Sequence, residues 1–249
     1  MITDLQGRTA LVTGATSGIG RAIALALAAR GAHVIVSGRD ADRGAVAVNA
    51  ITAAGGSADF LAADLSTTEG AHGLAEAATG RGRSVDILIN NAGIFPYAST
   101  ADTPDADLHA VYATNVLAPF VLVGELAPLM AERGHGAVIN ITSGAATQPS
   151  GPGQALYGSS KASLDYLTRA WAAEFGPSGV RVNAVSPGII RTEGTAPLGD
   201  TLDQMTSSLA AGRVGDPEEV AVVCAFLASH EASYIYGAII PVDGGVSVA

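Results

Sequence analysis

The stretch Thr9-Ala10-Leu11-Val12-Thr13-Gly14-Ala15-Thr16-Ser17-Gly18-Ile19-Gly20 decides the fold. Its first five residues have the apolar, β-branched composition of a buried strand, and an alanine-rich run follows the last glycine. The glycines permit a tight turn and remove the Cβ atoms that would hold a pyrophosphate away, while the amides of the following helix face the phosphate charge. The spacing is Gly-x3-Gly-x-Gly rather than the common Gly-x-Gly-x-x-Gly. The strand–turn–helix context nevertheless predicts a dinucleotide site at Gly14, Ser17, Gly18, Ile19 and Gly20.

The same strand–helix unit recurs along the chain. Short apolar runs predict strands at 9–13, 33–37, 58–62, 86–89, 136–141, 180–185 and 237–242. Longer runs between them predict helices at 18–30, 40–54, 67–79, 105–133, 154–175 and 217–227. Continuous apolar strands separated by helices indicate a parallel sheet that is covered on both faces. We therefore expect an α/β fold, a Rossmann-type doubly wound parallel sheet of about seven strands with helices on both faces.

No linker, repeat or break in composition interrupts this pattern. Residues 1–249 are therefore predicted to form a single domain that binds the dinucleotide and also carries its own substrate site. The polar, glycine-containing segment 193–213 fits a flexible lid over that site, and a plain surface loop is the alternative.

Composition and charge exclude several classes of protein. The chain is 48% hydrophobic, which excludes a disordered chain, and its net charge of −10 argues against nucleic acid as a partner. With Cys224 alone no disulfide framework forms, and the five histidines lack ligand spacing, so no metal is expected. The N-terminus lacks the regions of a signal peptide, and the uncharged run 110–124 is shorter than the ~20 residues of a spanning helix. We expect a cytoplasmic protein that does not associate with membranes.

The residues after the second strand bear on which dinucleotide binds. An NAD site places an Asp or Glu about 20 residues beyond the glycines, where the carboxylate binds the ribose 2′-hydroxyl. Gly38 stands near that place here, and Arg39 follows it. Without a carboxylate a 2′-phosphate is not repelled, and a guanidinium can bind it. The prediction is NADP(H), with NAD(H) not excluded; the alternative for Arg39 is a solvated loop cation.

Tyr157 and Lys161 form a candidate acid–base pair. Residues four apart on a helix share a face, so the phenol and the ammonium point the same way. A phenol with a pKa of about 10 is a poor acid–base group at neutral pH, and a neighbouring cation lowers that pKa. Lys161 is the only lysine beside 12 arginines, which marks the position where a compact ammonium is used. Ser143, at the end of the preceding strand, is placed to hold a substrate carbonyl oxygen.

With these motifs the chain resembles the short-chain dehydrogenase/reductase family, in its single-domain form, over essentially its whole length. The motifs that carry the resemblance are, in order, 13–20, Asp64, Asn90-Asn91-Ala92-Gly93, Asn115, Ser143, Tyr157-x3-Lys161, Pro187-Gly188 and Val242-Asp243-Gly244-Gly245. The resemblance implies reversible, metal-free hydride transfer between NADP(H) and a carbonyl or secondary alcohol.

The resemblance also implies a role for each matching residue. Tyr157 would be the general acid in reduction and the base in oxidation, and Ser143 would polarise the carbonyl. Lys161 would also bind the nicotinamide ribose, and Asn115 would hold a water in a proton relay. Taken alone, Asn115 in its apolar stretch is better explained as a buried, hydrogen-bonded amide. Further implied cofactor-binding residues are Asp64 and Leu65 towards the adenine, Asn91, Ala92 and Gly93 in the cleft, and Pro187, Gly188, Ile190 and Thr192 beside the nicotinamide.

The substrate and the assembly are less defined by the sequence. Candidate substrate-wall residues after the strand ends are Phe95, Tyr97, Ala145 and Gln154. We expect a free small-molecule carbonyl or alcohol. The alternative, a 3-oxoacyl reductase acting on acyl carrier protein, is disfavoured because the net charge opposes an acidic carrier. A non-catalytic sensor of NADP(H) is a second alternative. Such a protein is expected to lack one of the four catalytic residues, and Asn115, Ser143, Tyr157 and Lys161 are all present. The apolar helical runs predict a homotetramer.

Overall fold

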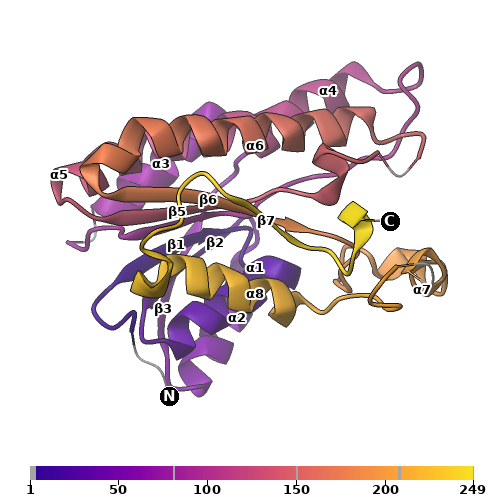
Figure 1. Cartoon of the computed structure of the whole chain (residues 1–249). Helices are drawn as coiled ribbons and strands as arrows, with labels where there is room; N and C mark the ends of the chain where they lie inside the picture. Colours follow the sequence, from indigo (N-terminus) through magenta and orange to yellow (C-terminus); the bar gives the residue numbers. More distant parts are fainter. Residues whose placement is uncertain (1–3, 81, 150, 207–208, 249) are drawn as a thin grey trace.

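Seven strands pair in one parallel sheet in the order β3-β2-β1-β4-β5-β6-β7 (Figure 1). The computed structural model describes residues 4–80, 82–149, 151–206 and 209–248. The strands are β1 (Thr9–Thr13), β2 (His33–Gly38), β3 (Ser57–Ala62), β4 (Ile87–Asn90), β5 (Gly136–Ile141), β6 (Val180–Pro187) and β7 (Ile239–Val242). The predicted doubly wound α/β sheet is confirmed.

Helices connect successive strands. They are α1 (Gly18–Ala29), α2 (Ala41–Ala53), α3 (Thr68–Thr79), α4 (Asp105–Tyr112), α5 (Ala118–Glu132), α6 (Ala155–Phe175), α7 (Thr201–Thr206) and α8 (Pro217–Ala228). Side-chain caps fix two of the starts, since the Asp40 carboxylate accepts from the Arg43 N–H and the Thr67 hydroxyl accepts from the Gly70 N–H. Each cap satisfies a first-turn N–H that has no partner inside its helix.

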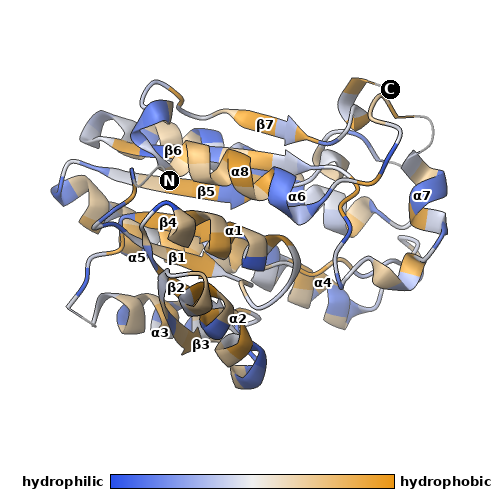
Figure 2. Cartoon of the chain, turned by 90° about the horizontal axis from the view of Figure 1, so that it is seen from below, coloured by the Kyte–Doolittle hydropathy of each residue, from blue (hydrophilic) through white to orange (hydrophobic). Residues whose placement is uncertain are grey.

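The sheet separates two hydrophobic cores. Helices α1, α2 and α8 cover one face, and α3, α5 and α6 cover the other (Figure 1). Successive side chains of a strand point to opposite faces, so β1 sends Val12 into the first core and Leu11 into the second. Figure 2 shows the apolar colouring of α1, α8 and the strands that they cover. Burial on both faces explains the near-continuous apolar strands in the sequence.

The strand order reverses beside β1. Its neighbours are β2 on one side and β4 on the other. The chain therefore leaves the carboxyl ends of β1 and β4 in opposite directions, and a crevice opens between them. Open α/β sheets bind their ligands at such a crevice, and here the glycine-rich turn lies in it.

Buried amides align the strands that carry the site. The Asn90 Nδ2 of β4 donates to the Asn140 Oδ1 of β5 at 2.9 Å, and the Asn140 Nδ2 donates to the Thr168 hydroxyl of α6 at 2.8 Å. All three side chains are buried, so these bonds are costly to break. The chain of bonds fixes α6 against the strand that ends near Ser143.

The predicted helix 105–133 is interrupted in the structure. Helices α4 and α5 are joined by a π-helical turn, Ala113–Leu117, in which the Ala118 N–H bonds to the Ala113 carbonyl. Pro119 has no N–H for the carbonyl of Asn115 four residues earlier, so a regular α-helix cannot continue there. Such turns are frequent at functional sites, and this one contains Asn115.

Two further differences concern the end of the chain. The polar connection after β6 contains α7, which the sequence pattern did not predict. The last strand begins at Ile239 rather than 237, because Gly237 adopts a φ of +67° that a strand does not allow.

The run Asp105–Glu132 is, by length and composition alone, long and apolar enough to cross a membrane. The uncharged segment 110–124, which the sequence analysis compared with a membrane span, is therefore only part of a longer apolar helical run. Half of the most apolar part of this run is buried within the protein, and Leu122, Leu126 and Met130 belong to the core beneath α5. In this fold the buried face of α5 packs against the sheet.

Candidate active site

The glycine-rich turn packs directly against the backbone that follows β4. Gly14 has a φ of +62°, and a Cβ there would lie 2.9 Å from the Ala92 Cα. A Cβ at Gly20 would collide with the Gly14 carbonyl oxygen and the Asn91 side-chain amide. Glycine is therefore required at both positions by close contact, in addition to any approach of a phosphate.

Asn91 and Thr13 hold the two sides of the crevice together. The Asn91 Nδ2 donates to the carbonyl oxygens of Thr13 at 2.9 Å and Gly14 at 3.1 Å. In return, the Thr13 hydroxyl oxygen accepts from the N–H groups of Asn91 and Ala92, both at 3.0 Å. The floor of the predicted cofactor site is thus a cross-linked unit of β1 and β4.

Ser143 and Tyr157 meet at the carboxyl end of β5. Ser143 follows β5 and caps the short turn Gly144–Ala146, and Tyr157 lies in the first turn of α6. Their hydroxyls share a hydrogen bond, and burial raises the pKa of the Tyr157 phenol despite it. The sequence argument expected Lys161 to lower this pKa. That expectation does not hold here, because loss of water around the phenolate dominates.

Lys161 is buried one helical turn beyond Tyr157. Its Nζ donates to the Ile141 carbonyl oxygen at 2.8 Å and lies 5.8 Å from the centroid of the Tyr157 ring. Burial lowers the pKa of the Lys161 ammonium from 10.5 to about 8, and the negative charge of Asp165 acts in the opposite direction. The Lys161 ammonium therefore loses its proton near pH 8, where a solvated lysine stays charged.

Asn115 is fully buried in the π-helical turn. Its Oδ1 accepts from the Ile94 N–H at 2.9 Å, and its Nδ2 donates to the Ile94 carbonyl at 3.0 Å and to the Ser160 hydroxyl at 3.0 Å. A Cβ added at Gly93 would lie 3.3 Å from the Asn115 Oδ1 and 3.4 Å from the Lys161 Nζ. Because Gly93 has no side chain, the space beside its Cα is bordered by both the Asn115 Oδ1 and the Lys161 Nζ.

The candidate adenosine-side residues follow β2 and β3. Arg39 is exposed directly after β2, and Asp64 is exposed with its Oδ1 accepting from the Ser66 N–H at 3.0 Å. Hydrogen bonds from Ser66 lower the pKa of Asp64, and the positive charge of Arg39 adds to this effect. Leu65 is buried beside them. The structure therefore brings Arg39 and Asp64 close together.

The segment after β6 returns to the glycine-rich turn. Gly188 lies against Asp243, where a Cβ would come within 2.6 Å of the Asp243 Cα, and Ile190 is buried. Pro187 ends β6, and Thr192 lies 3.3 Å from the place of a Cβ on Gly18. Thr192 thus lies beside the glycine-rich turn, and the role of these four residues in cofactor binding stays a prediction. Residues 207 and 208 of the expected lid, 193–213, lie outside the described residues.

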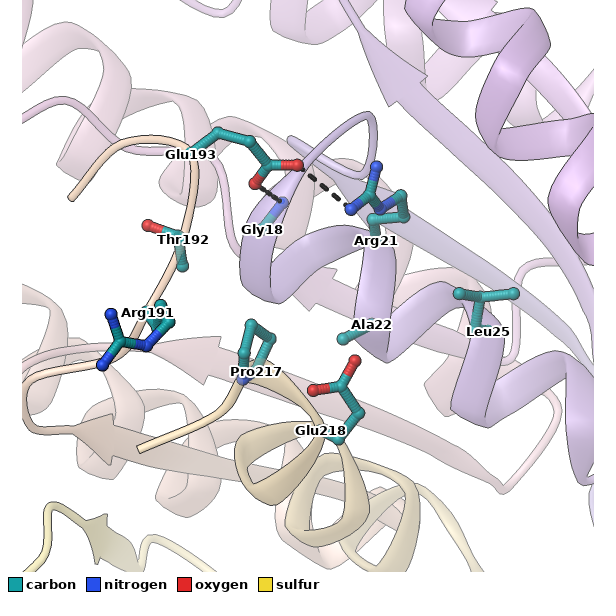
Figure 3. A pocket seen from close by; sticks show the side chains of 9 residues that line it. All are labelled: Gly18, Arg21, Ala22, Leu25, Arg191, Thr192, Glu193, Pro217 and Glu218. Atoms are coloured by element: carbon teal, nitrogen blue, oxygen red, sulfur yellow. Dashed lines mark hydrogen bonds and ion pairs between the residues drawn. The ribbon is translucent and has the colours of Figure 1, made fainter. Parts of the chain in front are cut away.

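Glu193 is predicted only as the first residue of the lid 193–213, and the structure places its side chain against the glycine-rich turn. Its Oε2 accepts from the Gly18 N–H at 2.9 Å, and its Oε1 lies 3.0 Å from the Arg21 guanidinium (Figure 3). It lines a cavity of about 330 Å³ beside the first turn of α1, and this cavity does not include Tyr157, Ser143 or Lys161. The only signal in the sequence is an acidic residue directly after Thr192.

The four candidate substrate residues are divided between two places. The Phe95 ring lies edge-on to the Tyr157 ring, with 6.1 Å between the centroids, and Ala145 donates its N–H to the Ser143 hydroxyl at 3.2 Å. Tyr97 is 66% exposed, and its ring lies where a Cβ on Gly153 would be. Gln154 precedes α6. Phe95 therefore contacts Tyr157, and Ala145 contacts Ser143.

The described residues fit a dinucleotide. A glycine cradle without Cβ atoms lies at the strand-order reversal, and the carboxylate of Glu193 already occupies an anion position at the start of α1. A helix N-terminus of this kind accepts phosphate in the same way.

Comparison with known proteins gives the family. A family model described as enoyl-(acyl carrier protein) reductase matches residues 14–247. A galactitol 2-dehydrogenase (L-tagatose-forming) of Cereibacter sphaeroides is 40% identical over 98% of this chain and 96% of its own. A 3-oxoacyl-[acyl-carrier-protein] reductase of Escherichia coli is 38% identical over 98% of both chains. The chain belongs to the short-chain dehydrogenase/reductase family.

A solved structure of this family supports the same fold. A Beutenbergia cavernae protein, provisionally assigned as an NAD(P)-dependent gluconate 5-dehydrogenase and bound to NADP at low occupancy, superposes with a TM-score of 0.94. It is 40% identical, and the match covers 100% of both chains. The chain is thus an oxidoreductase of the short-chain dehydrogenase/reductase family.

The packing of the glycine-rich turn leads to a stability prediction. Gly20→Ala places a methyl group against the Gly14 backbone and the Asn91 amide, and we expect a loss of about 1–3 kcal/mol in the free energy of unfolding. The matched control is Gly73→Ala in α3, where a Cβ meets open space. Alanine favours a helix interior over glycine, so this control should gain about 0.5–1 kcal/mol. Urea unfolding measures both, and equal effects would contradict the packing argument.

Proposed function

We propose that this short-chain dehydrogenase/reductase interconverts a carbonyl and a secondary alcohol with NADP(H), using Tyr157 as general acid and base. The observation that carries the proposal is the Ser143–Tyr157 hydroxyl pair, with buried Lys161 one helical turn away, at the sheet edge that also holds the glycine cradle. NADP(H) bound there would supply or accept the hydride.

Ser143 and Tyr157 supply the polar chemistry of the reduction. Their two hydroxyls are close enough to bond one carbonyl oxygen, which would stabilise the negative charge that develops on it. Because burial raises the pKa of Tyr157, the phenol keeps its proton at neutral pH and is ready to donate it. In the oxidation direction the phenolate is needed, and the charge of Lys161 favours it.

Lys161 and Asn115 would connect the phenol to cofactor and solvent. An ammonium has three donors, and Lys161 directs one of them at the Ile141 carbonyl. We assign the others to the nicotinamide ribose hydroxyls. The Asn115 Oδ1 borders the same space beside Gly93, which supports its role in holding a relay water. The alternative, a purely structural amide, is also compatible with its three hydrogen bonds.

The substrate is proposed to be a free small molecule. The sugar-alcohol dehydrogenase and the 3-oxoacyl reductase reported above are about equally similar to this chain, so family membership does not decide between them. The net charge of −10 favours a free carbonyl or alcohol over an acidic carrier protein.

The exposed apolar side chains on α4–α6, Leu108, Tyr112, Leu117, Phe120 and Tyr166, support assembly into a homotetramer.

The chain is proposed to work as one NAD(P)-binding domain that carries its own substrate site, with 193–213 as its lid. The Arg191–Asp203 ion pair at 2.8 Å links the base of this segment to α7. The bond from the Thr195 hydroxyl to the Ile190 carbonyl, also 2.8 Å, fixes its first turn.

The mechanism is tested by removing one oxygen atom. Tyr157→Phe should abolish turnover, with kcat falling at least about a hundredfold, because the proton donor is lost. The dissociation constant of NADPH should stay nearly unchanged. Tyr234→Phe, at a side chain that is 99% exposed and outside the helices of the proposed tetramer contact, is the control and should keep wild-type kcat. Turnover retained in Tyr157→Phe would reject the mechanism.

The titration of Lys161 predicts the pH dependence of reduction. Since the pKa of Lys161 is about 8, kcat/KM for reduction should fall above about pH 8, where the ammonium loses its charge. Asp165 raises that pKa, so Asp165→Asn should move the fall to lower pH. Glu174→Gln, an equal change of charge at an exposed position of α6, should leave the profile in place. A profile identical in all three proteins would contradict this role.

Cofactor choice is tested at Arg39. A guanidinium that binds the 2′-phosphate contributes about 1.5–3 kcal/mol, so Arg39→Gln should weaken NADPH binding by about ten- to a hundredfold. NADH binding should change little. Arg43→Gln, which removes another exposed cation four residues further along the chain, should alter neither. Fluorescence titration of both cofactors decides, and a wild-type preference for NADH would overturn the choice of NADP(H).

A further inference from the structure

Glu193 occupies the anion position of the glycine-rich turn. One carboxylate oxygen accepts from the Gly18 N–H, and the other pairs with Arg21, also in the first turn of α1 (Figure 3). The first N–H groups of a helix have no partner within it, and they carry the positive end of the helix dipole. The chain thus satisfies its own phosphate-type donors with a side chain from a segment 175 residues away.

A carboxylate and a phosphate compete for these donors. Both are anions that accept charge-assisted hydrogen bonds from N–H groups and guanidinium. A dinucleotide pyrophosphate that binds at the start of α1 would use the first N–H groups of this helix, and the Gly18 N–H is one of them. Two anions sharing that place would also repel each other, so Glu193 has to leave when the pyrophosphate arrives.

The surroundings of Glu193 allow the side chain to leave while its backbone stays. Buried Ile190 and the bond from the Arg191 N–H to the Gly215 carbonyl at 2.8 Å anchor the segment before it. The bond from the Thr195 N–H to the Thr192 hydroxyl at 3.2 Å closes the turn after it. The Glu193 side chain is itself 55% exposed. Rotation into water therefore breaks two contacts and no packing in the core.

We propose that Glu193 is an internal competitor of the cofactor pyrophosphate and thereby sets the affinity for the dinucleotide. In the free chain the Glu193 carboxylate fills the phosphate position. When the dinucleotide binds, this carboxylate moves into solvent, and the Gly18 N–H and the Arg21 guanidinium then bind the phosphate oxygens. The identity of the dinucleotide rests on the proposed function, whereas the competition itself requires only a pyrophosphate group.

The competition has a distinctive signature. The apparent dissociation constant of any ligand equals its intrinsic constant divided by the fraction of chains in which its position is free. The pyrophosphate is common to NADPH and NADH, so relief of the block strengthens both by the same factor. A change at Arg39, in contrast, acts on the 2′-phosphate and therefore on NADPH alone.

The test measures binding without turnover. Titration calorimetry of wild type, Glu193→Gln and Glu193→Ala with NADPH, NADH and inorganic pyrophosphate gives three dissociation constants for each protein. We expect both variants to bind all three ligands about three- to tenfold more tightly, the range of an exposed ion pair and one hydrogen bond. Circular dichroism and thermal melting check that each variant is folded.

The matched control is Glu218→Gln. Glu218 lines the same cavity and loses the same charge, but the Gly18 N–H donates to Glu193 and not to Glu218. Its dissociation constants should stay within about twofold of wild type, because charges in water are screened.

Two results would overturn the inference: unchanged or weaker pyrophosphate binding in folded Glu193 variants, or an equal gain in Glu218→Gln. If no protein binds either dinucleotide, the proposed function fails, and the pyrophosphate titration still decides the competition.

Discussion

The contact of the glycine-rich turn with the backbone after β4 is the constraint on which the site depends. Without Cβ atoms at Gly14 and Gly20, the loops leaving β1 and β4 approach closely enough for Asn91 to bond two carbonyl groups of the turn. The same bonds fix the position at which α1 begins. Backbone packing therefore fixes the place of the Gly18 N–H, where an anion can bind. Glu193, in the segment after β6, extends its carboxylate to that place.

Burial, rather than proximity of charges, has the largest effect on the pKa values of Tyr157 and Lys161. The phenol of Tyr157 has a raised pKa and the ammonium of Lys161 has a lowered one, so both shifts disfavour the charged form. An ammonium is a compact charge on a flexible stem, whereas a guanidinium is a larger planar fork. The Lys161 Nζ lies 2.8 Å from the Ile141 carbonyl and 3.4 Å from the place of a Cβ on Gly93, a confined position that suits the compact group.

The fold was predictable from the sequence because its signals are periodic and local. The seven strands lie within about two residues of the apolar runs, since burial on both faces leaves little freedom in their composition. The π-helical turn at Asn115 was not predicted, because a missing N–H at Pro119 acts on a carbonyl four residues away and leaves the helical period intact. The short helix α7 likewise lacks a clear apolar period.

The site was predictable only in part, for a different reason. Motif spacing gave Tyr157, Lys161 and Ser143, and the structure does bring them together. Spacing says nothing about solvation, so the direction of the Tyr157 pKa could not be read from a neighbouring cation. Nor does it indicate that Glu193 crosses to Gly18, since that contact depends on how the segment after β6 turns over the sheet.

That segment joins the two halves of the site. Glu193 contacts the first turn of α1. The next residue is Gly194, and a Cβ on it would lie 3.3 Å from the Phe95 ring. Phe95 in turn contacts the Tyr157 ring. A side chain at 194 would press on Phe95, so glycine there lets the segment pass between the phosphate position and the substrate wall. Residues 192–194 thus meet one geometric demand, which is that a single turn contacts the start of α1 on one side and reaches Phe95, the neighbour of Tyr157, on the other.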